Sequence, residues 1–203
     1  MPSKPRPVHL PPKDFRSRTI SVTAQKAGIW YRVFPGAFNP IYFSKNDANR
    51  FSPSAGPCGA LYVAADPETC LMETYGDRIY GFKQRNEQVA LPDSDWKSRH
   101  VALLTVPALP ICDLTNPKTL QECGVDATAL VYPELAVPQA WAIAIMQHPA
   151  SFAGIRYLSR FTHAPCLAIF DRVPNVGVRR SLGSLPTIAA ADRILEQFDI
   201  ALV

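Results

Sequence analysis

The sequence predicts a single α+β domain in which strands and helices are mixed. At 203 residues, of which 47% are hydrophobic, the chain is long enough to bury one core, and two full domains would be cramped. Short apolar runs of strand length occur among segments of helical spacing, without the regular strand–helix–strand rhythm of a doubly wound sheet. The sequence contains no internal repeat.

Residues 1–20 are predicted to form an extended, basic arm ahead of a domain that spans 21–203. Five prolines in this segment remove backbone donors and fix angles that a helix or a central strand cannot use. The first 27 residues carry a net charge of +5, and the remaining 176 carry −1. Phe15 is the only aromatic residue among those 27, so a solvated leader is favoured over a nucleic-acid-binding arm.

The first half of the domain is expected to contain two strands and a helix. Gly28–Phe34 alternates and carries aromatic residues, as a strand does, and a polar, turn-rich stretch follows over 39–57. Gly59–Ala65 is an apolar run of strand length. Asp66 then supplies an N-cap for a helix that should stop at Gly76.

The second half is predicted from the same kinds of pattern. Residues 84–100 are predicted to form a polar connection between strands. Helical spacing is found in Val137–Gln147 and Thr187–Phe198. The further predicted strands are Arg78–Phe82, Val101–Val106, Gly154–Tyr157, Cys166–Phe170, Val176–Arg179 and Ile200–Val203.

Cysteine and hydropathy patterns restrict the class of protein. The five cysteines are dispersed in apolar surroundings, which indicates reduced, buried thiols, and no local spacing fits a zinc site, so no metal is expected. No run of 18 apolar residues and no secretory signal are found. We therefore expect a cytoplasmic protein that does not span a membrane.

Familiar local motifs for nucleotide and hydrolase chemistry are absent. The sequence lacks G-x-G-x-x-G, G-x-x-x-x-G-K-[ST], G-x-S-x-G and H-E-x-x-H. Candidate functional residues must therefore come from separate segments that folding brings together.

One ordered series of residues resembles a known family. Arg32 lies in the first strand, Arg50 in the following loop, Tyr62 on the next strand, Glu73 in the capped helix and Ser159 after Gly-Ile-Arg-Tyr-Leu late in the chain. Arg50, Tyr62 and Glu73 are 12 and 11 residues apart. The series resembles the RES family, named for an Arg, a Glu and a Ser, and covers roughly 29–171. One departure is that Asn and Phe flank Arg50, where the family often has Gly and Trp.

The RES resemblance implies a fold similar to the ADP-ribosyltransferase toxins and an enzyme that destroys NAD⁺ by cleaving its nicotinamide–ribose bond. Some members perform a phosphorolysis, with inorganic phosphate as co-substrate, and hydrolysis by water is the other option. NAD⁺ is the substrate, and no separate cofactor is implied. A cognate antitoxin, often of the Xre helix-turn-helix type, is the implied partner, and a homodimer is left open.

The chemistry of the reaction suits the matched residues. Nicotinamide leaves as a neutral molecule, so cleavage mainly requires stabilisation of a cationic ribose, for which Glu73 is the candidate. Arg32 and Arg50 would bind the pyrophosphate, because a guanidinium binds phosphate in a bidentate manner. Tyr62 offers a stacking face, and Ser159 can donate a hydrogen bond. The resemblance thus makes Arg32, Glu73 and Ser159 the catalytic candidates.

Two further residues from the matched segments, Tyr31 and Arg156, are substrate-binding candidates. Arg160, next to Ser159, competes with Arg156 for a role at phosphate. Taken alone, Glu73 falls on the helix face opposite Leu71 and Met72, which is typical of an exposed residue without function. Only the joint order of the residues favours a site.

Two other functions are left open by the sequence. An ADP-ribosyltransferase would use the same bond cleavage with a macromolecular acceptor. A non-catalytic nucleic-acid-binding module would use the basic arm, although direct nucleic-acid binding is not expected.

Overall fold

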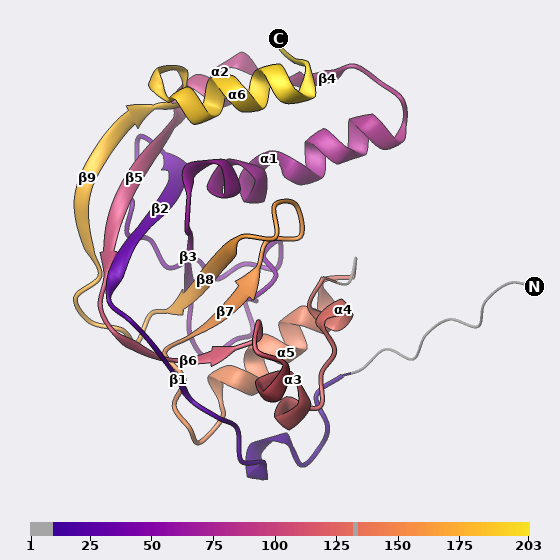
Figure 1. Ribbon diagram of the computed structural model, residues 1–203, viewed down its shortest axis with the longest axis vertical. Helices are drawn as coiled ribbons and strands as arrows, with labels where there is room; N and C mark the ends of the chain where they lie inside the picture. The colour runs from indigo at the N-terminus through magenta and orange to yellow at the C-terminus, as the bar shows by residue number, and fades with distance from the viewer. Residues whose placement is uncertain (1–9, 132–133) are drawn as a thin grey trace, which may run out of the picture.

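A curled, eight-stranded sheet organises the chain in the computed structural model, which describes residues 10–131 and 134–203 (Figure 1). The strand order is β1-β6-β7-β8-β3-β2-β5-β9. The strands are β1 (Thr23–Gln25), β2 (Gly28–Pro35), β3 (Ala60–Ala64), β5 (Arg99–Val106), β6 (Leu109–Asp113), β7 (Gly154–Leu158), β8 (Pro165–Phe170) and β9 (Gly177–Ser184). Strands β6 and β7 are parallel, and the other neighbours are antiparallel. The mixed sheet confirms the predicted α+β class.

The helices form two groups on one face of the sheet, as Figure 1 shows. One group contains α1 (Pro67–Gln84), α2 (Asp93–Ser98) and α6 (Ala189–Phe198). The other contains α3 (Pro117–Cys123), α4 (Ala127–Leu130) and α5 (Ala136–Met146). The remaining elements are the 3₁₀ helices η1 (Phe15–Ser17) and η2 (Leu185–Thr187) and a parallel pair of short strands, β4 (Val89–Leu91) and β10 (Ile200–Leu202).

Alternation along the strands divides the core between the two faces of the sheet. On β3, Ala60 and Ala64 face the α5 group, whereas Leu61 and Val63 face the opposite side. The opposite side is covered in part by the segment that follows β2, through Ile41 and Phe43. The helix-covered face therefore carries two core clusters, one under α5 and one under α1 and α6.

Helix α1 is longer than the sequence predicts. It passes through Gly76 and continues to Gln84, so the strand predicted over Arg78–Phe82 is wrong. A Cβ atom on Gly76 would lie 2.7 Å from the ring of Phe161. Gly76 therefore allows close packing and does not end the helix. The helix continues because its own residue Ile79 is fully buried in the core.

The segment 84–100, predicted as a polar connection, contains β4 and α2. Trp96 of α2 is fully buried and packs on Tyr75 of α1, with ring centroids 5.3 Å apart. The single aromatic residue of α2, Trp96, thus holds this short polar helix against the core. The elements β1, β6, α3 and α4 were also not predicted, because each is short.

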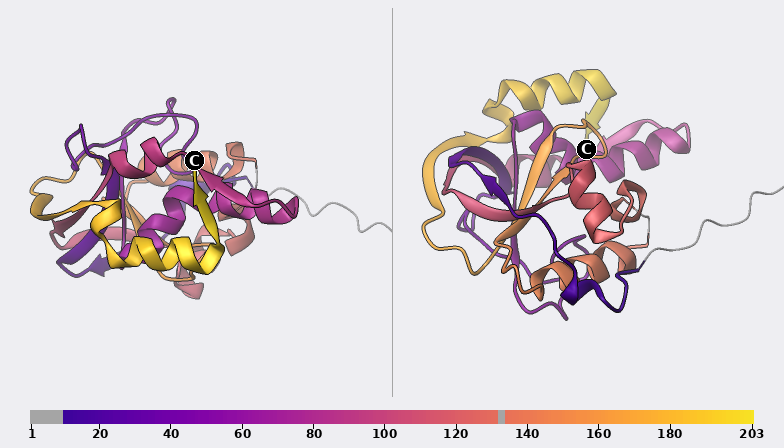
Figure 2. Two further views of the ribbon diagram at one scale, coloured as in Figure 1. Left: turned by 90° about the horizontal axis from the view of Figure 1, so that it is seen from above. Right: turned by 60° about the horizontal axis from the view of Figure 1, so that its bottom comes forward.

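Part of the predicted arm is packed on the domain. Residues 1–9 lie outside the described residues, but Phe15 of η1 is buried and contacts Trp141 and His148 at 5.4 Å between ring centroids. The right-hand view of Figure 2 shows η1 beside α5. The packed domain therefore begins at Phe15 rather than near Ile20. Trp141 of α5, on which Phe15 packs, is fully buried.

The five cysteines are free and buried, as predicted. Across the residues that the structure describes, no helix is long and apolar enough to cross a membrane.

Candidate active site

Helix α1 carries Glu73 and is fixed at its start by a cap and an anchor. The side chain of Asp66 accepts a 2.7 Å hydrogen bond from the backbone N–H of Thr69, which satisfies a free donor of the first turn. The thiol of Cys70 accepts a 3.0 Å hydrogen bond from the N–H of Val33 on β2. Glu73 follows on the exposed side of the helix, as its place opposite Leu71 predicts.

Both oxygens of the Glu73 carboxylate accept a hydrogen bond from the end of β7. The hydroxyl of Ser159 donates to Oε1 at 2.8 Å, and the phenol of Tyr157 donates to Oε2 at 3.1 Å. Residues two apart on a strand project from the same face, which explains why both reach Glu73. The carboxylate is therefore held in one orientation while Glu73 remains exposed.

Ser159 is fully buried, and its hydroxyl group donates one hydrogen bond and accepts two. Besides donating to Glu73, its Oγ atom accepts from the N–H groups of Phe161 at 3.2 Å and Thr162 at 3.4 Å. A hydroxyl with one proton and two lone pairs has no further bonding capacity. Ser159 is therefore a fixed donor to the carboxylate and not a free nucleophile.

The loop after Ser159 is docked on α1. The hydroxyls of Thr162 and Thr69 lie 2.9 Å apart, and the ring of Phe161 occupies the space above Gly76. The guanidinium of Arg160 forms an ion pair with Asp77, one turn along α1 from Glu73. These contacts bring the end of β7 and the middle of α1 together and so create the site.

Two phenols lie near the carboxylate, that of the buried Tyr157 and that of the half-buried Tyr62. The ring of Tyr157 packs on Phe51, with centroids 5.0 Å apart, and the hydroxyl of Tyr62 accepts a 2.9 Å hydrogen bond from the N–H of Phe51. Burial, together with the nearby charge of Glu73, raises the pKa of Tyr157 well above its usual range. Burial raises the pKa of Tyr62 to about 12. Both phenols therefore remain protonated hydrogen-bond donors at neutral pH.

Arg50 brings a positive charge to the same region. Its Nη1 atom donates a 2.7 Å hydrogen bond to the backbone carbonyl of Leu130. Burial and the positive charge of Arg160 lower the pKa of Arg50, and the negative charge of Glu73 opposes that effect. The three charged groups thus influence one another across the site.

The family model of the RES domain matches residues 29–188, most of the chain. The chain belongs to the RES domain family. A chain of the crystal structure of the M. tuberculosis MbcT-MbcA toxin-antitoxin complex has a similar fold, with a TM-score of 0.58 and 17% sequence identity, and the match covers 79% of this chain and 86% of that chain. No curated protein sequence matches. The predicted family and fold class are thereby confirmed.

Arg32, the residue matched to the Arg of the RES name, does not join the carboxylate cluster. It lies two residues from both Trp30 and Phe34 along β2, so it projects with them from the sheet face opposite the helices. Its guanidinium donates to the backbone carbonyls of Tyr62 at 3.5 Å and Tyr42 at 3.2 Å, and burial lowers its pKa to about 10. Its Nε atom is buried without a partner among the described residues.

The other two predicted residues of the RES site are divided between the faces. Tyr31 lies on the helix-covered face and packs against both core clusters there. Arg156 alternates with Ile155 and Tyr157 and so faces away from Glu73, where it donates to Oε1 of Gln25 at 3.3 Å. The structure therefore brings Glu73 and Ser159 into contact, places Arg50, Tyr62 and Tyr31 on the same face, and separates Arg32 and Arg156 from them.

Sequence reasoning missed Tyr157 as a member of the candidate site around Glu73. The signal was present, because strand alternation places a residue two positions before Ser159 on the same face. In the part of the chain that the structure describes, no group of three or more His, Cys, Asp and Glu side chains could hold a metal ion.

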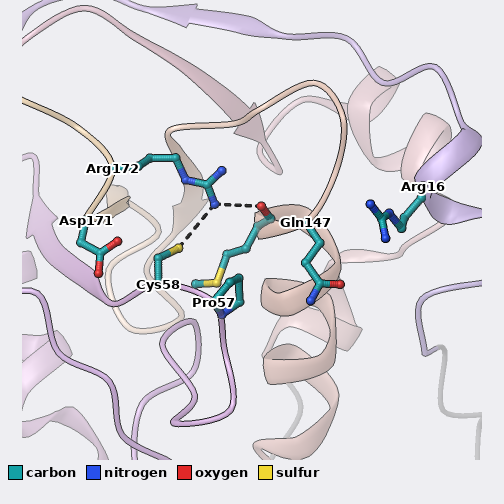
Figure 3. A pocket seen from close by; sticks show the side chains of 7 residues that line it. Arg16, Pro57, Cys58, Gln147, Asp171 and Arg172 are labelled. Atoms are coloured by element: carbon teal, nitrogen blue, oxygen red, sulfur yellow. Dashed lines mark hydrogen bonds between the residues drawn. The ribbon is translucent and has the colours of Figure 1, made fainter.

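A separate, open cavity of about 640 Å³ lies on another part of the RES domain (Figure 3). Its lining residues are Arg16, Pro57, Cys58, Met146, Gln147, Asp171 and Arg172. Arg172 donates to the carbonyl of Met146 at 2.8 Å, and Asp171 accepts from the N–H of Gly59 at 2.8 Å. The one carboxylate of this cavity is thus engaged with backbone, and none of the residues predicted for the site lines the cavity.

Proposed function

We propose that this RES domain cleaves the nicotinamide–ribose bond of NAD⁺ and that Glu73 stabilises the ribosyl cation formed during cleavage. The observation that carries the proposal is the carboxylate of Glu73, which is exposed yet held at both oxygens by Ser159 and Tyr157. A carboxylate fixed in this way provides negative charge where a cationic transition state develops and needs no reorganisation during the reaction.

The bond changes follow from the substrate. The C–N bond between the ribose and the nicotinamide breaks, and its electron pair goes to the ring nitrogen, so that nicotinamide leaves uncharged. The ribose carbon then forms a bond to the oxygen of an acceptor. With water as acceptor, Glu73 is placed to receive the proton that the water loses. With phosphate as acceptor, the product is ADP-ribose 1″-phosphate.

Two features of the site suit the rest of the dinucleotide. Arg50 supplies a guanidinium for the pyrophosphate, because guanidinium groups form paired, charge-assisted hydrogen bonds with phosphate. Tyr62 and Tyr31 lie on the same face as Glu73, where an aromatic ring can stack on a base. Arg32 and Arg156, in this proposal, support the sheet and do not touch the substrate.

The experiment that tests the proposal is incubation of the purified protein with NAD⁺ in phosphate-free buffer and in phosphate, with chromatography of the products. Nicotinamide together with ADP-ribose indicates hydrolysis, and nicotinamide together with ADP-ribose 1″-phosphate indicates phosphorolysis. Glu73→Gln should lower turnover by about two orders of magnitude or more and leave the fold intact. Glu68→Gln, which changes an exposed carboxylate on the same helix, is the matched control.

A protein-linked ADP-ribose product that forms only when cell extract is added would assign the site to an ADP-ribosyltransferase instead. Absence of nicotinamide release under all of these conditions would contradict the proposal.

We further propose that the protein acts as a toxin on cytoplasmic NAD⁺ and is neutralised by a cognate antitoxin. The support is the shared fold with a chain of a toxin-antitoxin complex. Expression of the wild-type chain should stop growth and deplete cellular NAD⁺, and expression of Glu73→Gln should do neither. An antitoxin of the Xre helix-turn-helix type would restore growth when it is co-expressed.

A further inference from the structure

Arg160 lies near Glu73, although it is not one of the three residues for which the RES family is named. It directly follows Ser159, whose hydroxyl bonds to the Glu73 carboxylate. Its guanidinium is paired with Asp77, which lies four residues after Glu73 on α1. Residues four apart on a helix share one face, so Arg160 contacts α1 one turn beyond the carboxylate of Glu73.

One face of the Arg160 guanidinium packs on an aromatic ring, and the side chain is still partly exposed to solvent. Its guanidinium lies 4.6 Å above the ring of Phe161, and that ring stacks on Tyr80 with centroids 5.5 Å apart. The side chain of Arg160 is 31% exposed, and that of its partner Asp77 is 78% exposed. A guanidinium that rests on an aromatic face and still reaches solvent can bind an anion without a large rearrangement.

Arg50 is the second cation near the carboxylate of Glu73. Its Nη1 atom is bound to the carbonyl of Leu130, and the neighbouring Phe51 packs on the ring of Tyr157, which itself bonds to Glu73. The positive charge of Arg160 contributes to the lowered pKa of Arg50, as expected for two cations that are near each other. A bound dianion would relieve this repulsion.

We propose that Arg50 and Arg160 together bind the pyrophosphate of the dinucleotide and that Asp77 competes with the pyrophosphate for Arg160. Arg160 thus takes the role that the sequence assigned to Arg32. The identity of the dinucleotide rests on the proposed function, but the binding of a pyrophosphate anion does not.

Binding of inorganic pyrophosphate to the whole protein, measured by titration calorimetry, tests the pair without any turnover. Arg160→Ala and Arg50→Ala should each raise the Kd roughly tenfold or more, because each removes charged hydrogen bonds to the anion. Arg78→Ala changes an exposed arginine next to Asp77 on the same helix and should leave the Kd unchanged. An unchanged Kd in Arg160→Ala would overturn the proposal.

Asp77→Asn separates an anion-binding role of Arg160 from a purely structural one. If Asp77 competes with pyrophosphate, this variant lowers the Kd severalfold. If Arg160 serves only to hold the loop on α1, breaking the ion pair loosens the loop and the Kd does not fall, which would contradict the proposal. Arg160→Lys keeps the charge without the paired geometry and should give an intermediate Kd. Melting temperatures verify that each variant is folded.

Comparison of two substrates separates this inference from the proposed function. Nicotinamide riboside contains the cleaved bond but no phosphate. Arg160→Ala should raise the KM for NAD⁺ and leave the KM for the riboside unchanged, whereas an equal rise for both would contradict a role at the pyrophosphate. If the wild-type protein binds pyrophosphate through Arg160 but releases no nicotinamide, the proposed function fails and the anion site stands.

Discussion

The hydroxyl of Ser159 donates a 2.8 Å hydrogen bond to the carboxylate of Glu73 across 86 residues of sequence. The same oxygen of Ser159 accepts two backbone N–H groups of the loop that follows it. One hydroxyl thus connects the geometry of the carboxylate to the conformation of the loop, and changes at Ser159 should affect both.

Ser159→Ala should lower both turnover and stability. The carboxylate loses one of its two donors, and the N–H groups of Phe161 and Thr162 lose their acceptor, which together costs about 1–3 kcal/mol of unfolding free energy. Urea unfolding and NAD⁺ kinetics measure the two effects. Ser181→Ala, at an exposed position of β9, is the control and should change neither. Full stability in Ser159→Ala would show that the loop does not depend on this hydroxyl.

Stability should fall as the pH rises above about 10, where tyrosines of the unfolded chain ionise. Burial raises the pKa of Tyr62 to about 12 and raises that of Tyr157 well above its usual range, so the folded state holds protons that the unfolded state releases. The stabilisation is complete below pH 10 and is lost as the pH increases through that window. Urea unfolding from pH 8 to 11 measures the slope. Tyr157→Phe should reduce the slope, and an equal slope in this variant would contradict the assignment.

Substitution by alanine should change the stability of the protein in opposite directions at two glycines of α1. Gly76→Ala places a methyl group against the ring of Phe161 and should destabilise the protein by about 1–3 kcal/mol. Gly81→Ala meets only the end of the Arg85 side chain at 3.5 Å and should stabilise the helix by about 0.5–1 kcal/mol. Thermal unfolding of the two variants provides the comparison. Similar melting temperatures would show that Phe161 moves away freely.

Arg32→Lys should reduce stability more than it reduces the binding of pyrophosphate. The buried guanidinium bonds to the carbonyls of Tyr62 and Tyr42, and a single ammonium cannot reproduce both bonds, which costs about 1–3 kcal/mol. Urea unfolding and calorimetry distinguish the two effects. A variant as stable as the wild type that no longer binds pyrophosphate would place Arg32 at the substrate.

Local patterns predicted most of the strands and the capped start of α1, because alternation and caps depend on neighbouring residues. The length of α1 could not be predicted, since Gly76 is accommodated by Phe161, which is distant in sequence. The order of Arg50, Tyr62, Glu73 and Ser159 selected residues that the fold places on the helix-covered face of the sheet. The displacement of Arg32 from the carboxylate was not predicted, because it depends on which strand face β2 turns toward the helices.

Strands β2 and β3 pair only at Tyr31 and Ala64, a narrow seam inside an otherwise well-bonded sheet. Glu73 comes from the helix anchored to β2, and its two donors come from β7 on the other side of that seam. The Glu73 carboxylate thus connects the helix that is anchored to β2 with the end of β7. A ligand or partner that displaces the Glu73 side chain from Ser159 and Tyr157 would therefore also weaken the contact between α1 and the end of β7.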